Sequence, residues 1–348
     1  MTMFCYGTRF SSVTDPLLHQ ILEDASTIAS FRSTNCNAQD FMPYLRYVPN
    51  GRRIAKAIEV RARRDKWLTT MLENVRISLT TRMGLKKSVA EMLLTDDQDG
   101  LTKVDVKTIL GGLMSGGFET IFSTAIITIG FLSSVEGQAI QKKAYDDILS
   151  VYGTPENAFE ACITEEKCIY VSALVKEALR FYPPLKLLPA RQTYKDFVYQ
   201  GSHIPKGVLI YVNAQAANRD TNVYGPDAGQ FKPDRWIEKT HDIPPPYHFA
   251  FGAGGRMCTA VNFSNRVLYA IFLRLIVAFD VRESKISPPN IHYIDYKRDP
   301  TEANAIPCDF NVRLTPRNEK VLRGVLDRLK AQSVCVESES GAAVASCP

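Results

Sequence analysis

The chain has 348 residues, enough for one large domain or two ordinary ones, and 45% of them are hydrophobic, as in a globular protein with a sizeable core. The formal net charge of +5 is spread along the sequence. The most basic stretch, residues 52–66, is interrupted by Glu59 and Asp65, so it is interpreted as a solvated helix face. This pattern argues against a nucleic-acid-binding groove.

The eight cysteines contain no Cys-x-x-Cys pair and no tight spacing. This argues against a zinc site or a disulfide framework and favours a reducing compartment. Residues 1–10 lack the charged start and apolar run of a signal peptide. The most apolar stretch, Ile121–Leu132, is too short to span a bilayer and contains hydroxyl side chains. We therefore expect neither a signal segment nor a transmembrane anchor in this chain.

Helical patterns dominate the first half of the chain. Asp15 can cap a helix whose first turn contains Pro16, and apolar residues follow at helical spacing. Residues 37–49 are expected to form a loop or short helices rich in aromatic side chains. The helices predicted in this half are Asp15–Arg32, Arg52–Ser78, Ser88–Leu94 and Thr102–Phe131.

The long apolar run Thr102–Phe131 contains two adjacent glycines, Gly116 and Gly117, which weaken a helix. A break in a buried helix is often where a small molecule approaches the backbone. Glu119 and Thr120 place an acid and a hydroxyl directly beside this break. Taken alone, the glycine pair indicates a kink that permits close packing.

Two further helices are predicted at Gln138–Tyr152 and Glu165–Phe181, and the second ends at Pro183-Pro184, which cannot continue a helix. Glu177 and Arg180 are three residues apart, so they share one helix face and can pair. By itself, such a pair is an ordinary surface ion pair.

From residue 193 onward the pattern changes to strands. Short apolar or alternating runs predict strands at 193–199, 203–205 and 208–212, separated by glycine turns. A turn over residues 296–307 precedes another predicted strand, Cys308–Leu314. A charged helix, Asn318–Gln332, is expected near the C-terminus, and the small, polar residues after it are expected to be disordered.

Cys258 lies in a glycine-rich loop, His248–Ala260, and an apolar helical pattern follows over Thr259–Phe279. The loop thus brings one cysteine to a helix start, where unpaired N–H groups and the helix dipole favour a thiolate. A thiolate is a strong electron donor to a metal, and haem iron is the first candidate. The alternative for a single cysteine is packing in the core.

Three ordered segments together resemble the cytochrome P-450 monooxygenases. They are Gly116-Gly117-x-Glu119-Thr120, Glu177-x-x-Arg180 with the aromatic-x-Pro-x-Arg segment Phe231–Arg235, and Phe251-x-x-Gly254-x-Arg256-x-Cys258-x-Ala260. The family usually has glycine where this chain has Ala260. The resemblance implies a mainly α fold with small β-sheets. It further implies that residues 1–317 form a cytochrome P-450 catalytic domain lacking its N-terminal part, followed by a helix and tail over 318–348.

The resemblance also implies roles for particular residues. Cys258 would be the axial ligand to the iron of haem b, within a haem-binding loop that contains Phe251 and Gly254. Arg256 and Arg191 would face the haem propionates; for Arg191 the alternative is a surface charge at a strand start. The residues that would border the substrate are Gly116, Phe118, Leu187, Leu188, Asn304 and Ala305.

Two further sets of residues have implied roles. Thr120 would hydrogen-bond dioxygen, and Glu119 would help to relay protons to it. Glu177, Arg180 and Arg235 would be structural and would hold the core on which the cysteine loop rests.

Ser115–Ile127 and Asp295–Phe310 are most similar to the fungal hydroxylases of phenylacetate and hydroxyphenylacetate. The implied reaction is ring hydroxylation of a small aromatic acid with O2, using electrons from NADPH through a reductase. Family members with a membrane anchor act at the cytosolic face of the endoplasmic reticulum. The alternatives are a fungal secondary-metabolite hydroxylase, a haem-thiolate isomerase or dehydratase, and an inactive truncated fragment without haem. Glu119-Thr120 argues against the isomerase or dehydratase.

Overall fold

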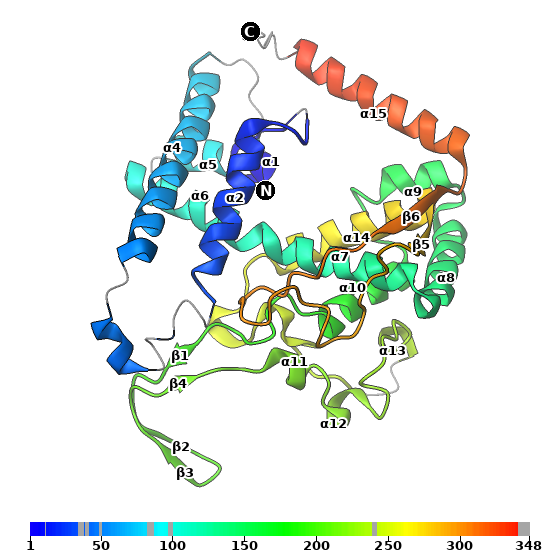
Figure 1. Ribbon diagram of the computed structural model, residues 1–348. Helices are drawn as coiled ribbons and strands as arrows, with labels where there is room; N and C mark the ends of the chain where they lie inside the picture. Colours follow the sequence, from blue (N-terminus) through cyan, green and yellow to red (C-terminus); the bar gives the residue numbers. More distant parts are fainter. Residues whose placement is uncertain are drawn as a thin grey trace. The chain divides into compact units, whose positions relative to one another are not determined.

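A computed structural model describes residues 1–10, 12–33, 38, 42–48, 51–81, 87–96, 100–238 and 242–339 of the chain. Helices dominate it, and its strands form three two-stranded antiparallel sheets (Figure 1). The prediction of a mainly α fold with small β-sheets is therefore confirmed. The chain divides into two compact units, Met1–Glu119 with Gly324–Pro348, and Thr120–Arg323.

The first unit packs its helices around apolar side chains that include Leu68 and Leu110. Asp15 starts α2, as predicted, because its carboxylate accepts two backbone N–H groups of the first helical turn. The helices of this unit are α1 (Thr2–Tyr6), α2 (Pro16–Ser30), the 3-10 helix η2 (Pro43–Tyr47), α4 (Gly51–Thr81), α5 (Val89–Thr95) and α6 (Lys103–Gly117).

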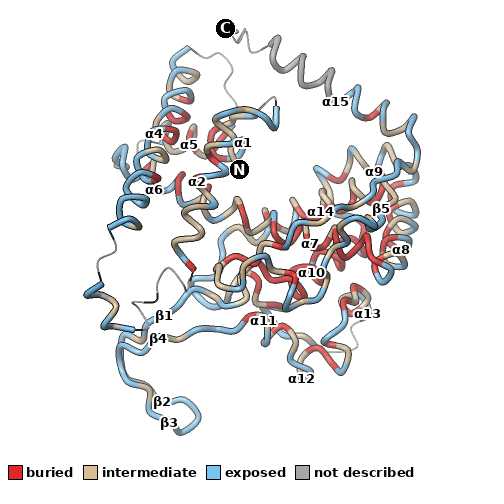
Figure 2. The backbone as a smooth tube through the Cα atoms, viewed as in Figure 1, coloured by how far each residue is buried: buried red, intermediate tan, exposed pale blue. Residues whose placement is uncertain are grey.

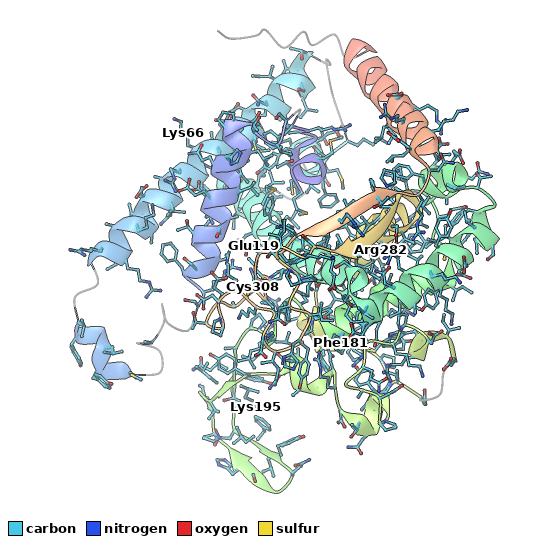
Figure 3. All side chains as sticks on the ribbon, turned by 45° about the vertical axis from the view of Figure 1, so that its right-hand side comes forward. Lys66, Glu119, Phe181, Lys195, Arg282 and Cys308 are labelled. Atoms are coloured by element: carbon cyan, nitrogen blue, oxygen red, sulfur yellow. The ribbon has the colours of Figure 1, made fainter. Side chains whose placement is uncertain are left out.

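A buried carboxylate ties α2 to α4. Asp24 is fully buried and accepts hydrogen bonds from Arg63 Nε and Nη2 at 2.9 and 2.6 Å. Trp67 Nε1 donates to the other carboxylate oxygen at 3.2 Å. These donors satisfy a charge that would otherwise be costly to bury. Lys66, labelled in Figure 3, is exposed, as expected for the predicted solvated face of this helix.

The second unit has its core along α10 and α14, where Leu174, Phe272 and Leu273 are fully buried (Figure 2). Its larger helices are α7 (Glu119–Ser133), α8 (Val135–Tyr152), α9 (Pro155–Ala161), α10 (Ile169–Phe181) and α14 (Val261–Ala278). Its shorter helices are α11 (Ala214–Ala217), α12 (Thr221–Tyr224), α13 (Arg235–Glu238), η4 (Phe249–Phe251) and η5 (Gly254–Arg256). The last described helix, α15 (Glu319–Glu339), begins in the second unit, and from Gly324 onward its residues are assigned to the first unit.

The sheets are small and antiparallel. The pairs are β1 (Arg191–Gln192) with β4 (Leu209–Ile210), β2 (Phe197–Tyr199) with β3 (Ser202–Ile204), and β5 (Phe279–Glu283) with β6 (Val312–Pro316). The β2–β3 hairpin, which follows Lys195 in Figure 3, is mostly exposed. The predicted strand at 308–314 begins later, at Val312, where pairing with β5 starts; before it, the Cys308 N–H donates to the Tyr296 carbonyl at 2.7 Å.

The break expected beside Gly116 and Gly117 in the run over 102–131 is present: α6 ends at Gly117, and Phe118, with φ −76° and ψ −57°, separates it from α7. Two other predicted helix boundaries were wrong. The helix predicted from Glu165 begins at Ile169, because the Cys168 N–H donates to the Tyr269 hydroxyl at 2.9 Å. The helix predicted to end at Gln332 continues to Glu339, and residues 340–348 lie outside the described chain.

Two helical stretches, Lys103–Ser133 and Val261–Ala278, are long and apolar enough to cross a membrane by length and composition alone. Core helices of soluble proteins meet the same criterion, and 50% and 44% of the most apolar windows of the two stretches are buried inside the protein. They are therefore weak evidence for a membrane anchor.

Candidate functional site

The loop His248–Ala260 consists of two short 3-10 helices, η4 and η5, joined through glycine. Gly252 and Gly254 both have φ of 75°, a left-handed conformation that glycine adopts without steric strain. The Cys258 N–H donates to the Phe251 carbonyl at 2.9 Å, which closes the loop on itself. This hydrogen bond fixes the backbone of Cys258 within the loop and does not involve its side chain.

The sulfur of Cys258 lies at the start of α14. Its Sγ accepts the N–H of Ala260, the N-cap residue of that helix, at 3.4 Å. A cysteine therefore stands at a helix N-terminus, with its sulfur beside a backbone N–H group. Cys258 is exposed, which argues against the alternative of a cysteine packed in the core.

The loop presents an open surface around this thiol. A Cβ added at Gly254 or Gly255 would find no atom within 4 Å. Residues 253–259 are all exposed, including Arg256 and Met257. One exposed thiol on an open glycine-rich loop could supply the single protein ligand to an iron whose other ligands come from a macrocycle, so these residues fit haem.

Glu177 and Arg180 form a bidentate pair on α10, and both side chains have 0% exposure. Arg180 Nε donates to Glu177 Oε2 at 2.9 Å, and Nη2 donates to Oε1 at 2.7 Å. The other N–H groups of Arg180 donate to the carbonyls of Asn218, Ala228 and Gln230. The alternative of an ordinary surface pair is wrong, because water is excluded from both charges.

Arg235 lies beside this pair. Its Nε is 3.8 Å from Glu177 Oε1, and its Nη1 donates to Asp227 Oδ1 at 2.6 Å. Burial alone would raise the pKa of Asp227, but the hydrogen bond and charge of Arg235 outweigh it and hold this pKa below its ordinary value. Trp236 Nε1 and the Lys232 N–H also donate to Glu177, at 2.9 and 2.7 Å. The structure thus brings Glu177, Arg180 and Arg235 into one buried cluster.

Two hydrogen bonds connect this cluster's surroundings to the cysteine loop, and no sequence pattern indicated them. Asn218 Oδ1 accepts the Phe249 N–H at 2.7 Å, and the Tyr224 hydroxyl donates to the Tyr247 carbonyl at 2.6 Å. Asn218 follows Ala216-Ala217 and precedes Arg219-Asp220, so its neighbours in the sequence do not indicate that it is buried.

His248, at the start of the loop, was also not singled out from the sequence. It is 6% exposed, and its Nδ1 accepts the Ala250 N–H at 3.4 Å. Burial, together with the positive charges of Arg180 and Lys176, lowers the pKa of His248 to about 4. This histidine is therefore neutral at physiological pH.

The segment Leu187–Arg191 lies beside the cysteine loop. Leu188 Cδ1 is 3.9 Å from the position that a Cβ on Gly252 would take. The Leu188 N–H donates to the Val212 carbonyl at 3.0 Å, and the chain then enters β1 at Arg191. Leu187 and Arg191 are exposed next to this contact.

Asn304 and Ala305 meet the chain just before Leu187. The Ala305 N–H donates to the Pro184 carbonyl at 2.8 Å, and Asn304 forms an isolated β-bridge with Leu185. Both residues are buried, and Ala305 belongs to the core of the second unit. Asn304 and Ala305 therefore lie beside residues 184–185, which come just before Leu187 and Leu188 in the chain.

The acid and hydroxyl predicted beside the helix break stand in the first turn of α7. Glu119 is buried at the start of this helix (Figure 3), and Thr120 is partly buried. Gly116 is exposed and Phe118 is partly buried. Glu119 ends the first unit and Thr120 begins the second.

Comparison of the sequence with known proteins identifies the family. The family model of cytochrome P-450 matches residues 1–294. Phenylacetate 2-hydroxylase of Emericella nidulans is 36% identical, over 91% of this chain and 61% of that protein. 3-Hydroxyphenylacetate 6-hydroxylase of the same organism is 34% identical, over 90% of this chain and 59% of that protein. The chain spans about three fifths of the length of these curated relatives. Because the family model matches most of the sequence, the chain belongs to the cytochrome P-450 family.

Proposed function

We propose that this chain acts in a haem-thiolate monooxygenase, with Cys258 as the axial ligand to the iron of haem b. The observation that carries the proposal is the position of its sulfur, exposed at the N-terminus of α14 and in contact with the Ala260 N–H. A backbone N–H directed at a thiolate stabilises its negative charge and tunes its donation to a metal. Membership of the cytochrome P-450 family supports the same role.

The other residues that would hold haem come from the same loop and from β1. Arg256 and Arg191 are both exposed, and their guanidinium groups suit the two propionate carboxylates. Phe251 offers an apolar ring beside the porphyrin. Gly254 has no side chain, so the backbone can approach a flat ligand closely.

When bound, haem supplies the reduction of dioxygen and the transfer of one oxygen atom to the substrate, with release of the other as water. This reaction consumes two protons. Thr120 Oγ1 would donate a hydrogen bond to dioxygen, and the Glu119 carboxyl would pass protons to that hydroxyl. The burial of Glu119 suits a proton carrier that is shielded from bulk water.

Glu177, Arg180 and Arg235 would support the cysteine loop without taking part in the chemistry. Every carboxylate oxygen of Glu177 is satisfied by two donors, so the cluster is rigid as well as buried. A rigid base beneath the loop keeps the thiolate in one place while the bond to iron forms and persists.

The electrons would come from NADPH through a reductase, and the chain would act at the cytosolic face of the endoplasmic reticulum. Both statements rest on the family to which the chain belongs.

The proposed substrate is a small aromatic acid of the arylacetate class, hydroxylated on its ring. This rests on the names of the two Emericella nidulans relatives, which are hydroxylases of phenylacetate and 3-hydroxyphenylacetate. The residues proposed to border the substrate are Gly116, Phe118, Leu187, Leu188, Asn304 and Ala305.

The test follows the oxygen atom. The haem-loaded chain is incubated with phenylacetate or 3-hydroxyphenylacetate, NADPH, a reductase and isotopically labelled dioxygen. We expect a ring-hydroxylated product that carries one labelled oxygen atom. The Thr120→Ala variant is expected to consume NADPH while forming much less product, and Thr120→Ser is expected to restore it.

Other outcomes would contradict parts of the proposal. Labelled product from other aromatic substrates, with none from arylacetates, would favour a secondary-metabolite hydroxylase. An unlabelled product together with full activity of Thr120→Ala would favour an isomerase or dehydratase. Failure of the chain to bind haem would favour an inactive fragment.

A further inference from the structure

We propose that Asn218 and Tyr224 are positioning residues that hold the start of the cysteine loop in register with the Glu177–Arg180–Arg235 cluster. They do so through side-chain hydrogen bonds to the backbone on either side of His248. The proposal rests on the proposed function of Cys258 as the haem ligand, since it assigns these residues an effect on that ligand.

Asn218 connects the end of α10 to the loop. Its carbonyl accepts a hydrogen bond from Arg180 Nη1 at 2.7 Å, and its Nδ2 donates to the Arg180 carbonyl at 3.0 Å. Its Oδ1 accepts the Phe249 N–H at 2.7 Å. Asn218 has 0% exposure, so no water competes for these three bonds. One buried residue therefore contacts both Arg180 and the loop, through its backbone carbonyl and its side-chain amide.

The sequence explains why α10 needs this partner. The carbonyl of Arg180 would normally accept the N–H of residue 184, but that residue is Pro184, which has none. Asn218 Nδ2 supplies the missing donor. On the loop side, the Phe249 N–H opens the 3-10 helix η4 and lacks a partner within that helix. Asn218 thus satisfies two helix ends with one amide.

Tyr224 makes the second connection. Its carbonyl accepts a hydrogen bond from Arg235 Nη1, and its hydroxyl donates to the Tyr247 carbonyl at 2.6 Å. Tyr247 has φ of 66°, a left-handed conformation that a residue other than glycine adopts at a cost of about 1 kcal/mol. Burial raises the pKa of Tyr224 to about 12, so its hydroxyl stays a donor at neutral pH. The hydrogen bond helps to hold this less favoured backbone turn.

The constraint reaches Cys258 through the loop itself. Phe249 is tied to Asn218 and opens η4, and η4 ends at Phe251. The Phe251 carbonyl accepts the Cys258 N–H at 2.9 Å. Movement of η4 would therefore move the Phe251 carbonyl, which accepts the hydrogen bond from the Cys258 N–H. Loss of either hydrogen bond should therefore let the Cys258 sulfur occupy a wider range of positions. Shifts of about 1 Å matter, because catalytic geometry is sensitive to displacements of that size.

The experiment compares the full chain with Asn218→Leu, Asn218→Asp and Tyr224→Phe variants. Hydrogen exchange is measured at the Phe249 and Cys258 amides in the absence of added haem. Loss of a buried acceptor is expected to speed exchange at Phe249 by about tenfold or more in Asn218→Leu. Asn218→Asp keeps the acceptor for the Phe249 N–H but loses the donor to the Arg180 carbonyl, so Phe249 should be better protected in this variant than in Asn218→Leu. Tyr224→Phe removes a single oxygen atom, so it tests the second connection with little risk to folding.

Matched controls remove similar hydrogen bonds elsewhere in the second unit. Tyr182 is fully buried and its hydroxyl donates to the Ile291 carbonyl at 2.7 Å, so Tyr182→Phe mirrors Tyr224→Phe. Gln141 is a buried amide bonded to the Val281 N–H and carbonyl, so Gln141→Leu mirrors Asn218→Leu. Neither control should change exchange at Cys258 selectively.

A second readout uses the haem-loaded variants. We expect Asn218→Leu and Tyr224→Phe to lower the fraction of reduced, carbon-monoxide-bound haem that shows a thiolate-type Soret band, and the controls to leave it unchanged. Unchanged exchange at Phe249 and Cys258 in both variants, or an equal loss of the thiolate-type band in the controls, would overturn the proposal. If the unsubstituted chain shows no thiolate-type band, the proposed function has failed, and the exchange data alone decide whether the two residues position the loop.

Discussion

Arg180 uses all of its guanidinium N–H groups inside the protein. Two donate to Glu177 and three donate to backbone carbonyls. A lysine at this position could satisfy only part of the set, because its ammonium has three donors and no planar fork. We expect Arg180→Lys to lower the free energy of unfolding by about 3 kcal/mol, measured by urea denaturation, since it leaves buried acceptors unpaired.

Arg323→Lys provides the matched control. Arg323 pairs with Glu319 on α15, and both side chains are largely exposed, so the same change of residue type should leave the unfolding free energy unaltered. Equal effects of the two substitutions would contradict the role assigned to burial at Arg180.

His248 gives the protein a pH dependence of known sign. Its pKa falls from 6.5 in an unfolded chain to about 4, mainly because of burial. Between these values the unfolded chain binds a proton that the folded chain does not, so stability is lost as the pH falls from 6.5 toward 4. The full loss is about 3 kcal/mol. Protonation would also remove the acceptor that His248 Nδ1 offers to Ala250.

The measurement is the urea midpoint at pH 7 and pH 5. The difference between the two midpoints is expected to shrink in His248→Gln, which cannot titrate. An unchanged difference would show that other groups cause the loss of stability at low pH.

Residues with local partners could be predicted, and those with distant partners could not. Glu177 and Arg180 are three positions apart, so helix geometry alone places them on one face. Asn218 bonds to a residue 31 positions away, and Tyr224 to one 23 positions away. Such pairings depend on how the intervening chain folds, which no local pattern encodes. The sequence therefore indicated Cys258 and the ion pair, but not the side chains that join them.

At the scale of elements, the α7–α8 turn depends on one close approach. A Cβ on Gly137 would lie 2.1 Å from the Phe131 carbonyl oxygen and 2.6 Å from Leu132 Cα, both backbone atoms. We expect Gly137→Ala to lower the unfolding free energy by about 3 kcal/mol or more, because the backbone must shift to accept the methyl group. Thermal denaturation followed by circular dichroism measures the effect.

Gly112→Ala is the control for this substitution. Gly112 lies within α6, and a Cβ there would meet no atom within 4 Å. This change should raise the unfolding free energy by about 0.5–1 kcal/mol, because alanine is the better helix former. Equal destabilisation at both positions would show that the close approach at Gly137 is not the cause of its effect.

The presence of each long helix could be predicted from apolar periodicity, but several ends could not. The start of α10 depends on the Tyr269 hydroxyl, which takes the Cys168 N–H. The start of α8 was expected at Gln138, but Ser134 caps it by accepting the Gly137 N–H at 3.2 Å. The start of α10 is set by a tertiary contact. The start of α8 is set by the Ser134 cap, which was not predicted because Gly137 in the first turn weakens the helical pattern.

At the scale of the whole molecule, the described chain has two separate apolar cores. Leu110 is fully buried in the first unit and Leu174 is fully buried in the second. Replacement of either by alanine should cost about 2–5 kcal/mol of stability. Hydrogen exchange should rise first in α4 and α6 for Leu110→Ala, and in α10 and α14 for Leu174→Ala. Uniform acceleration across both units in either variant would indicate one cooperative core.

The division of the chain at residues 119 and 120 could not be predicted from composition. One apolar run passes through it, and the hydrophobic pattern of α6 continues into α7. Composition could limit the protein to a globular class, and three spaced motifs could identify the family. The assignment of side chains to separate cores required the fold.

The central claim is that Cys258 binds haem iron through its thiolate. The most direct measurement is the absorption spectrum of the haem-loaded chain, reduced and bound to carbon monoxide. We predict the red-shifted Soret band of thiolate-ligated haem, its loss in Cys258→Ala and Cys258→His, and its retention in Cys308→Ala, which removes another exposed cysteine of the second unit. A histidine-type band in the unsubstituted chain, or a thiolate-type band that survives in Cys258→Ala, would contradict the claim.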